Sequence, residues 1–283
     1  MPVAASTLNF SIVDYPSSTA TNIYGINNAG SFVGDYSNGT NWNGFENIGG
    51  VFTTINFPSS TDTRIYGISN TGELVGQYQS GGVWHGFYDI GGTFTSVDPP
   101  GGTNTVLYGV NSSGLMVGQA TNGSVFGFTF DGTSFTTLLG PSSSCTMPTG
   151  INDSGTIAGN YCGGSGFLDT AGVFSTFNIA SGFTHPWDIS NSGDLAGTYI
   201  DGLFHGFVDV GGSAAALDYV TNGGCTSPHG INSSDVVVGT ETCGGGTHGF
   251  IATNNVPEPL TLAVFSAGLT GAAALRRRKK KSA

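Results

Sequence analysis

A repeat of about 42 residues is the feature of this chain that most constrains its fold. A turn of the general pattern apolar-Asn-x-x-Gly, preceded by glycine in all copies but one, recurs at steps of 42, 42, 41, 38 and 42 residues. A Gly-Phe pair recurs at steps of 42, 41, 39, 40 and 43 residues. The leading residues are Gly25, Gly67, Gly109, Gly150, Asp188 and Gly230 for the turn, and Gly44, Gly86, Gly127, Gly166, Gly206 and Gly249 for the pair. Both landmarks therefore count six copies of one unit.

Each unit contains four short apolar runs. In residues 65–100 these runs are IYGI, ELVGQY, VWHGFYDI and FTSVDP, and Gly, Asn and Ser separate them. Runs of this length, rich in aromatic and β-branched residues, indicate strands joined by tight hairpins. Four strands in about 40 to 45 residues is the period of a propeller blade. We therefore predict an all-β fold, a six-bladed β-propeller in residues 1–255, with blades starting near residues 23, 65, 107, 148, 186 and 228.

The two ends of the repeat region complement each other. A full copy ends in a Phe-rich run such as residues 52–58, whereas the sixth copy stops after residues 249–252 and lacks this run. A matching run, FSIVDYP, stands at residues 10–16, before the first complete copy. We predict that an N-terminal strand within residues 7–16 completes the last blade and closes the ring, which leaves only short, protected sheet edges.

Charge is distributed very unevenly along the chain. Six of the seven basic residues lie in residues 276–281, and 17 of the 18 acids precede Val256. Residues 1–255 therefore carry Arg64 as their one basic residue against 17 acids, a formal charge of −16. Such a surface repels phosphate backbones, so nucleic acid is excluded as a partner.

The four cysteines occupy equivalent positions in two copies. Cys145 and Cys225 each lie five residues before the leading glycine of their turn, while Cys162 and Cys243 follow theirs by twelve and thirteen. Each pair would join neighbouring strands of a hairpin, which favours the disulfides Cys145–Cys162 and Cys225–Cys243 and an oxidising compartment. A zinc site formed by all four, or free buried thiols, are the alternatives.

The C-terminus has three consecutive parts. Val256-Pro257-Glu258-Pro259 is followed by a mainly apolar stretch at residues 260–275 and then by a basic cluster. As a helix, the apolar stretch would span about 24 Å, slightly less than the hydrocarbon core of a bilayer. We predict a transmembrane helix at residues 260–275 with the cluster on the cytoplasmic side; an ordinary tail anchor is the alternative. The cluster consists of Arg276, Arg277, Arg278, Lys279, Lys280 and Lys281.

Residues 256–281 resemble the PEP-CTERM sorting signal of Gram-negative bacteria, which combines a Pro-Glu-Pro motif, a short transmembrane stretch and an Arg-rich end. The resemblance implies that an exosortase recognises Pro257, Glu258 and Pro259 and removes the tail. It also implies delivery to the cell envelope or the exopolysaccharide matrix.

Residues 1–255 resemble extracellular HAF-repeat proteins, which carry a His-Ala-Phe triplet after an Ile-Asn-x-x-Gly turn. The triplet has Gly in place of Ala here, as His85-Gly86-Phe87, His205-Gly206-Phe207 and His248-Gly249-Phe250. This resemblance implies a propeller-like fold and no particular activity.

The first ten residues, MPVAASTLNF, contain neither the basic nor the apolar region of a secretion signal. Because disulfides and a sorting tail fit an exported protein, we expect the export signal to lie upstream of Met1.

Residues that could form a site are few. The sequence has no Gly-x-Ser-x-Gly elbow, and residues 1–255 contain no lysine and no acid pair that stands out, so we expect no catalytic residues, no metal ligands and no cofactor. The residue before each leading position of the turn is aromatic in most copies and could contact glycans, or pack between blades as core. These residues are Tyr24, Tyr66, Tyr108, Trp187 and His229, with Thr149 in the fourth copy. We interpret Trp42, Trp84 and Phe204, two residues before the Gly-Phe pair, as core.

Two functions remain open at this point. One is a non-catalytic envelope or matrix protein that binds exopolysaccharide or other envelope proteins through its propeller. The alternative is a propeller enzyme, a polysaccharide lyase or hydrolase. Acids clustered around the central channel would favour the enzyme, and a channel of glycine and apolar groups would favour the binding protein.

Overall fold

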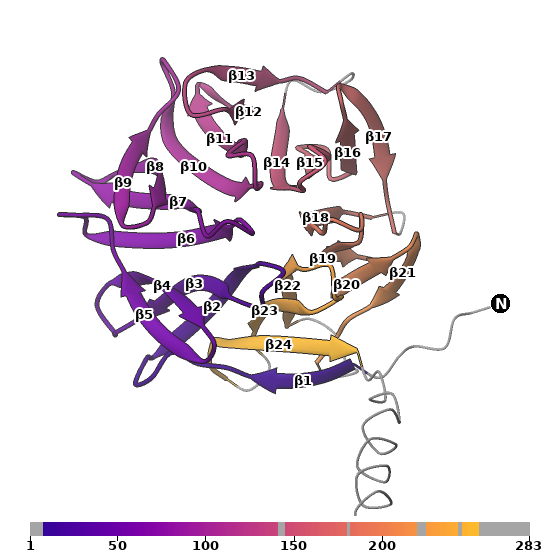
Figure 1. Cartoon of the computed structure of the whole chain (residues 1–283). Helices are drawn as coiled ribbons and strands as arrows, with labels where there is room; N and C mark the ends of the chain where they lie inside the picture. Colours follow the sequence, from indigo (N-terminus) through magenta and orange to yellow (C-terminus); the bar gives the residue numbers. More distant parts are fainter. Residues whose placement is uncertain (1–7, 141–144, 180–181, 220–224, 243–244, 255–283) are drawn as a thin grey trace, which may run out of the picture.

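A computed structural model describes residues 8–140, 145–179, 182–219, 225–242 and 245–254. In these residues 24 strands form six four-stranded antiparallel sheets. The sheets stand like wedges around one central axis (Figure 1). The prediction of an all-β, six-bladed β-propeller is confirmed.

In blades 1–5 the four strands follow one another in sequence from the centre to the rim, whereas the outermost strand of blade 6 comes from the N-terminus. Blade 1 contains β2 (Ala20–Ile26), β3 (Phe32–Ser37), β4 (Trp42–Ile48) and β5 (Val51–Ile55); blade 2 contains β6 (Asp62–Ile68), β7 (Leu74–Ser80), β8 (Val83–Ile90) and β9 (Thr93–Val97). Blade 3 contains β10 (Thr103–Val110), β11 (Met116–Asn122), β12 (Ser124–Phe130) and β13 (Phe135–Leu138); blade 4 contains β14 (Thr146–Ile151), β15 (Ile157–Tyr161), β16 (Gly166–Thr170) and β17 (Val173–Phe177). Blade 5 contains β18 (Thr184–Ile189), β19 (Leu195–Ile200), β20 (Phe204–Val210) and β21 (Ser213–Ala216); blade 6 contains β22 (Thr226–Ile231), β23 (Val237–Glu241), β24 (His248–Asn254) and β1 (Leu8–Ile12).

The N-terminal strand completes blade 6. Strand β1 runs antiparallel to β24, with Ile12 opposite Phe250, at the outer edge of the blade (Figure 1). The Phe10 ring lies 5.3 Å from that of Phe250 and 5.5 Å from that of Tyr219. The seam thus combines a ladder of backbone hydrogen bonds with aromatic packing.

A buried phenylalanine forms the centre of every blade. The side chain of the Gly-Phe pair is 0–1% exposed in all six copies: Phe45, Phe87, Phe128, Phe167, Phe207 and Phe250. The Phe87 ring lies over Gly76 of the second strand, where a Cβ would stand 3.0 Å from the ring and would clash with the carbonyl oxygen of Arg64. This close approach requires glycine on the second strand of each blade.

The glycine of the Gly-Phe pair is also required by a close approach of the backbone. A Cβ on Gly44 would lie 2.5 Å from the carbonyl oxygen of Ile55 and 2.9 Å from the Ile65 side chain of the next blade. Because the blades meet at this point, there is no room for the alanine of the HAF pattern.

The innermost strands come together at the leading position of the turn. Each of these strands carries a bulge there, for example between Ile23 and Gly25. A Cβ on Gly25 would stand 3.2 Å from the Cα of Gly67 in the next blade. In blade 5 the corresponding residue is Asp188, whose carboxylate accepts a hydrogen bond from the backbone N–H of Ile231 in blade 6.

One predicted disulfide is confirmed. Cys145 and Cys162 are bonded, with Cα atoms 5.6 Å apart, directly before β14 and directly after β15. Cys225 is also disulfide-bonded, and Cys243 lies outside the described residues.

The C-terminal prediction falls on residues that the structure does not describe. The motif Pro257 to Pro259, the helix at 260–275 and the basic cluster all belong to residues 255–283. None of the described residues forms a helix long and apolar enough to cross a membrane.

Candidate functional site

The six innermost strands enclose a cavity of about 380 Å³ on the axis of the propeller. Most of its lining residues come from β2, β6, β10, β14, β18 and β22 and from the turns that follow most of these strands, and Thr240 of β23 adds to them. The turn residues Asn28, Asn70, Asp153 and Asn191 are exposed, so the cavity opens on this face of the molecule.

The asparagine that begins the turn holds both its own hairpin and the neighbouring blade. The Asn27 Oδ1 atom accepts hydrogen bonds from the backbone N–H groups of Ala29 and Ser31, each at 3.0 Å. Its Nδ2 atom donates to the carbonyl oxygen of Ser69 in blade 2 at 3.4 Å. Asn111, Asn152 and Asn232 donate to the next blade in the same way, at 3.1–3.2 Å. These turn asparagines therefore form a nearly continuous polar ring that joins the blades around the mouth of the cavity.

Asp153 places a negative charge at the mouth. Its Oδ1 atom accepts a hydrogen bond from the Ser112 N–H at 2.7 Å, and its Oδ2 atom accepts from Asn191 at 2.6 Å and from Asn70 at 3.1 Å. Burial disfavours the carboxylate, but these hydrogen bonds outweigh it and lower the pKa of Asp153. The group is thus ionised at neutral pH.

Five aromatic side chains form a collar at the floor of the cavity. Centroids of successive rings are 4.8 Å (Tyr24–Tyr66), 5.3 Å (Tyr66–Tyr108), 6.5 Å (Tyr108–Trp187), 5.1 Å (Trp187–His229) and 5.2 Å (His229–Tyr24) apart. The indole reaches past the smaller Thr149 of blade 4, whose hydroxyl donates to the carbonyl oxygen of Pro186. The five residues singled out from the sequence therefore meet around the channel, where glycan contact stays a prediction.

Two tyrosines of the collar accept hydrogen bonds from side chains of the second strand of their blade. Gln77 donates to the Tyr66 hydroxyl at 3.0 Å, and Gln119 donates to the Tyr108 hydroxyl at 3.2 Å. Burial raises the pKa of Tyr108 to about 12 and shifts the pKa of Tyr24 and Tyr66 in the same direction. All three phenols are therefore neutral.

Asp188 is the second carboxyl group of the lining. It accepts hydrogen bonds from the backbone N–H groups of Ile189 at 2.8 Å and Ile231 at 3.1 Å. Burial raises the pKa of Asp188 to about 7 in spite of these bonds. Burial also lowers the pKa of His229, on the next blade, to about 3, so this imidazole is neutral. The sequence signal for Asp188 was its position as the one non-glycine among the six leading residues.

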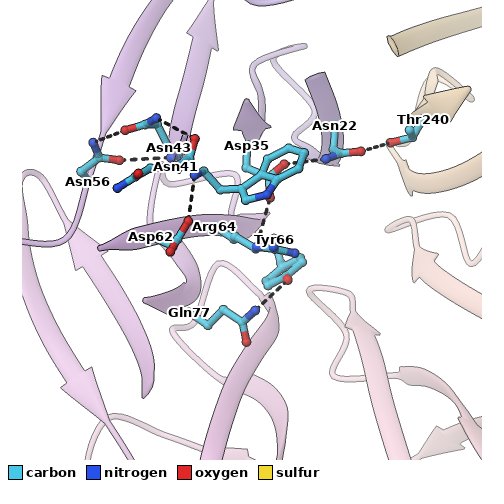
Figure 2. A network of polar contacts seen from close by, with 12 residues as sticks. Asn22, Asp35, Asn41, Asn43, Asn56, Asp62, Arg64, Tyr66, Gln77 and Thr240 are labelled. Carbon is cyan, nitrogen blue, oxygen red and sulfur yellow. Dashed lines mark hydrogen bonds and ion pairs between the residues drawn. The ribbon is translucent and has the colours of Figure 1, made fainter. Parts of the chain in front are cut away.

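A polar network supports the collar from blades 1, 2 and 6 (Figure 2). Thr240 donates to Asn22 at 3.2 Å, Asn22 donates to Asp35 at 2.7 Å, and Asp35 lies 3.6 Å from the Arg64 guanidinium. Burial raises the pKa of Asp35 to about 7, while Asn22 and Arg64 act in the opposite direction. The network ends at Tyr66 and Gln77 (Figure 2).

The three residues two before the Gly-Phe pair were assigned wrongly as core: Phe204 is half-buried, as are the two tryptophans. Trp42 and Trp84 are half-buried, and their ring centroids lie 5.3 Å from the Arg64 guanidinium carbon. The two indoles thus flank the arginine, a cation–π arrangement that partly desolvated guanidinium groups favour. The repeat pattern could not show this because it gives the position of each tryptophan but not the arginine between them.

The triplet histidines join the third strand of a blade to the segment that follows its fourth strand. His85 contacts Asp98 at 2.7 Å, His205 contacts Asp218 at 2.7 Å, and His248 contacts Asp14 at 2.9 Å. His205 has a further contact with Asp201 at 3.2 Å. Across the described ranges, no three His, Cys, Asp or Glu residues are grouped so that they could hold a metal ion.

No protein-family model matches the chain, and no curated protein matches it in sequence. Among solved structures, the sialidase of Trypanosoma rangeli is similar with a TM-score of 0.54 and 9% identity, over 90% of this chain and 60% of the sialidase. Virginiamycin B lyase of Staphylococcus aureus is similar with a TM-score of 0.47 and 12% identity, over 86% of this chain and 99% of the lyase. YCF48 of Cyanidioschyzon merolae is similar with a TM-score of 0.47 and 11% identity, over 82% of each chain. At these identities the sialidase likeness shows the β-propeller fold alone.

Proposed function

We propose that the protein is exported by a Gram-negative bacterium, is processed by an exosortase at Pro257-Glu258-Pro259, and acts in the cell envelope or exopolysaccharide matrix as a non-catalytic binding propeller. The observation that carries the proposal is the three-part order of the tail: the motif, the apolar stretch and the basic cluster. The helix at 260–275 would anchor the chain in the inner membrane until cleavage. The Cys145–Cys162 disulfide supports an oxidising compartment.

The cavity supports binding better than catalysis. General acid–base catalysis needs a pair of groups free to exchange protons with a substrate. Asp153 is held by hydrogen bonds from three residues, and the tyrosines have raised pKa values. The second candidate, a polysaccharide lyase or hydrolase, is favoured by one observation: Asp188 lines the cavity with a pKa of about 7.

The export proposal is tested in the host that encodes the protein and an exosortase. An epitope placed in the exposed hairpin at Gly211-Gly212 allows the chain to be followed in cell fractions. We expect a mature form without the tail in the envelope or matrix, and a full-length form in the inner membrane when the exosortase gene is deleted. The uncut chain in the cytosol of the unmodified host would contradict the proposal.

The choice between binding and catalysis is tested with exopolysaccharide from the same host. The mature protein should sediment with the polysaccharide and leave its chain length and reducing ends unchanged. Turnover that an Asp188→Asn variant loses would support the lyase or hydrolase instead.

A further inference from the structure

The charged side chains that line the cavity are all acidic. Asp153 and Asp188 line it, while no lysine or arginine occurs among the described residues of its lining. Arg64, the one basic residue of residues 1–255, contacts Asp35 and two indole rings instead. The 17 acids of the same region create a field that attracts cations. Charge therefore favours a cationic ligand over an anionic one.

The floor offers π surface. The hydroxyl groups of Tyr66 and Tyr108 are engaged by Gln77 and Gln119, which leaves the ring carbons of these residues as contact surface. Trp187 adds an indole between Tyr108 and His229, and one face of this indole is stacked on the His185 ring at 3.9 Å. Cations are attracted to the faces of tyrosine and tryptophan, most strongly where water is excluded.

We propose that the cavity binds the ammonium group of a small organic molecule above the aromatic collar, with the Asp188 carboxylate as its counter-ion. This inference rests on the binding role proposed above and names the ligand class. The ammonium group can belong to a free alkylammonium compound or to an amino sugar of a polysaccharide.

The affinity for choline, whose charge does not depend on pH, should increase with pH, because only the ionised Asp188 pairs with a cation. Between pH 5 and 8 the neighbouring His185 and His229 stay neutral, since burial lowers their pKa values to about 4 and about 3. The tyrosines stay neutral and Asp153 stays ionised. Asp35, beyond Tyr24, has a pKa of about 7 as well, so a variant of Asp188 is needed to separate the two carboxyl groups.

The experiment is calorimetric titration of the mature protein with two matched pairs of probes: choline against its uncharged carbon isostere, and glucosamine against N-acetylglucosamine. We expect the charged member of at least one pair to bind roughly tenfold more tightly. Choline preference would identify an alkylammonium ligand, and glucosamine preference an amino sugar. Equal binding within both pairs, or no binding of any probe, would overturn the inference.

The matched variant is Asp188→Gly, which introduces the residue that the other five blades carry at this position. It should reduce the affinity for the preferred cation roughly tenfold and remove the pH dependence of choline binding. Asp201→Asn makes the same change of charge at a half-exposed site outside the lining and should leave the affinity unchanged. An unchanged affinity in Asp188→Gly would overturn the inference, and Asp188→Asn replaces it if the glycine variant does not fold. Failure of these tests leaves the export proposal intact, because that proposal depends on where the chain is found and whether it is cut.

Discussion

Blades 1–3 and blades 4–6 build the same wedge from different residues around the channel. The first three blades place tyrosine in the collar, and the second strand supplies a polar side chain behind it: Asp35, Gln77 or Gln119. The last three blades place Thr149, Trp187 and His229 there. The residue that packs on the preceding blade is Ile23, Ile65 or Leu107 in the first half, and Pro148, Pro186 or Pro228 in the second half.

The difference separates the requirements of the fold from those of the site. The buried phenylalanine and the glycine beneath it occur in both halves. Proline is accepted in β14, β18 and β22 because an innermost strand has a free edge toward the channel, where a missing N–H removes no ladder bond. The collar varies only in blades 4–6, and Asp188 lies within that variable half. The asymmetry of the cavity is therefore not a requirement of the fold.

The largest effect is expected from replacing the glycine beneath the buried phenylalanine, which both halves of the propeller share. Gly76→Ala in blade 2 and Gly239→Ala in blade 6 each bring a Cβ against the carbonyl oxygen of the innermost strand and the ring of the buried phenylalanine. Neither half can relieve this clash without moving a strand, so each variant should lose about 4 kcal/mol or more of unfolding free energy. Thermal unfolding measures the loss. Gly163→Ala is the control, because a Cβ there meets no atom within 4 Å. Tolerance of one variant alone would show that the halves differ in their skeleton as well.

The next-largest effect is expected from Asp188→Gly, which gives blade 5 the glycine that blades 1–3 carry at this position. Burial raises the pKa of Asp188 from 3.8 to about 7, so the folded state binds a proton that the unfolded state has released between these values. The unfolding free energy should therefore fall as pH rises from about 4 to 7, by at most about 4 kcal/mol from this group. Asp188→Gly should flatten the profile and stabilise the protein at pH 8. Asp35 keeps a slope of the same sign in both proteins. Denaturant unfolding between pH 4 and 8 measures the unfolding free energy of both proteins. Identical pH profiles for the wild type and Asp188→Gly would contradict the raised pKa of Asp188.

The disulfide is a third difference, since its cysteines have no counterparts in blades 1–3. The bond closes a loop with a sequence separation of 17. Replacing both Cys145 and Cys162 by serine should cost about 3 kcal/mol, chiefly because the unfolded chain gains freedom. The wild-type melting temperature should fall in reductant, and the fall should be smaller in the double variant. A double variant that melts at the wild-type temperature would show that blade 4 does not depend on the bond.

The sequence predicted the skeleton well because period, glycine and phenylalanine are fixed by backbone contact in every blade. The innermost strands begin at residues 20, 62, 103, 146, 184 and 226, two to four residues before the predicted starts. The position of the collar residues also followed from the repeat. What the repeat could not give was contact between copies: Arg64 between Trp42 and Trp84, or Trp187 reaching Tyr108 past Thr149. Such contacts depend on how far a side chain extends into the neighbouring blade. The sequence of one copy does not contain this information.

The smallest effect compares one contact that both halves possess. His85 in blade 2 faces a single carboxylate, Asp98, whereas His205 in blade 5 lies between Asp218 and Asp201. The hydrogen bond with Asp218, followed by the charges of both acids, raises the pKa of His205. The stabilisation is therefore fully present below the ordinary histidine pKa and is lost as pH rises through the folded value. Because the pair is near the surface, His205→Ala should cost less than about 1 kcal/mol at pH 6 and still less at pH 8. His85→Ala should cost less than His205→Ala at pH 6, and denaturant unfolding of both variants measures the difference. A larger cost for His205→Ala at pH 8 than at pH 6 would mean that the imidazole acts through packing, and the second carboxylate would then not distinguish blade 5 from blade 2.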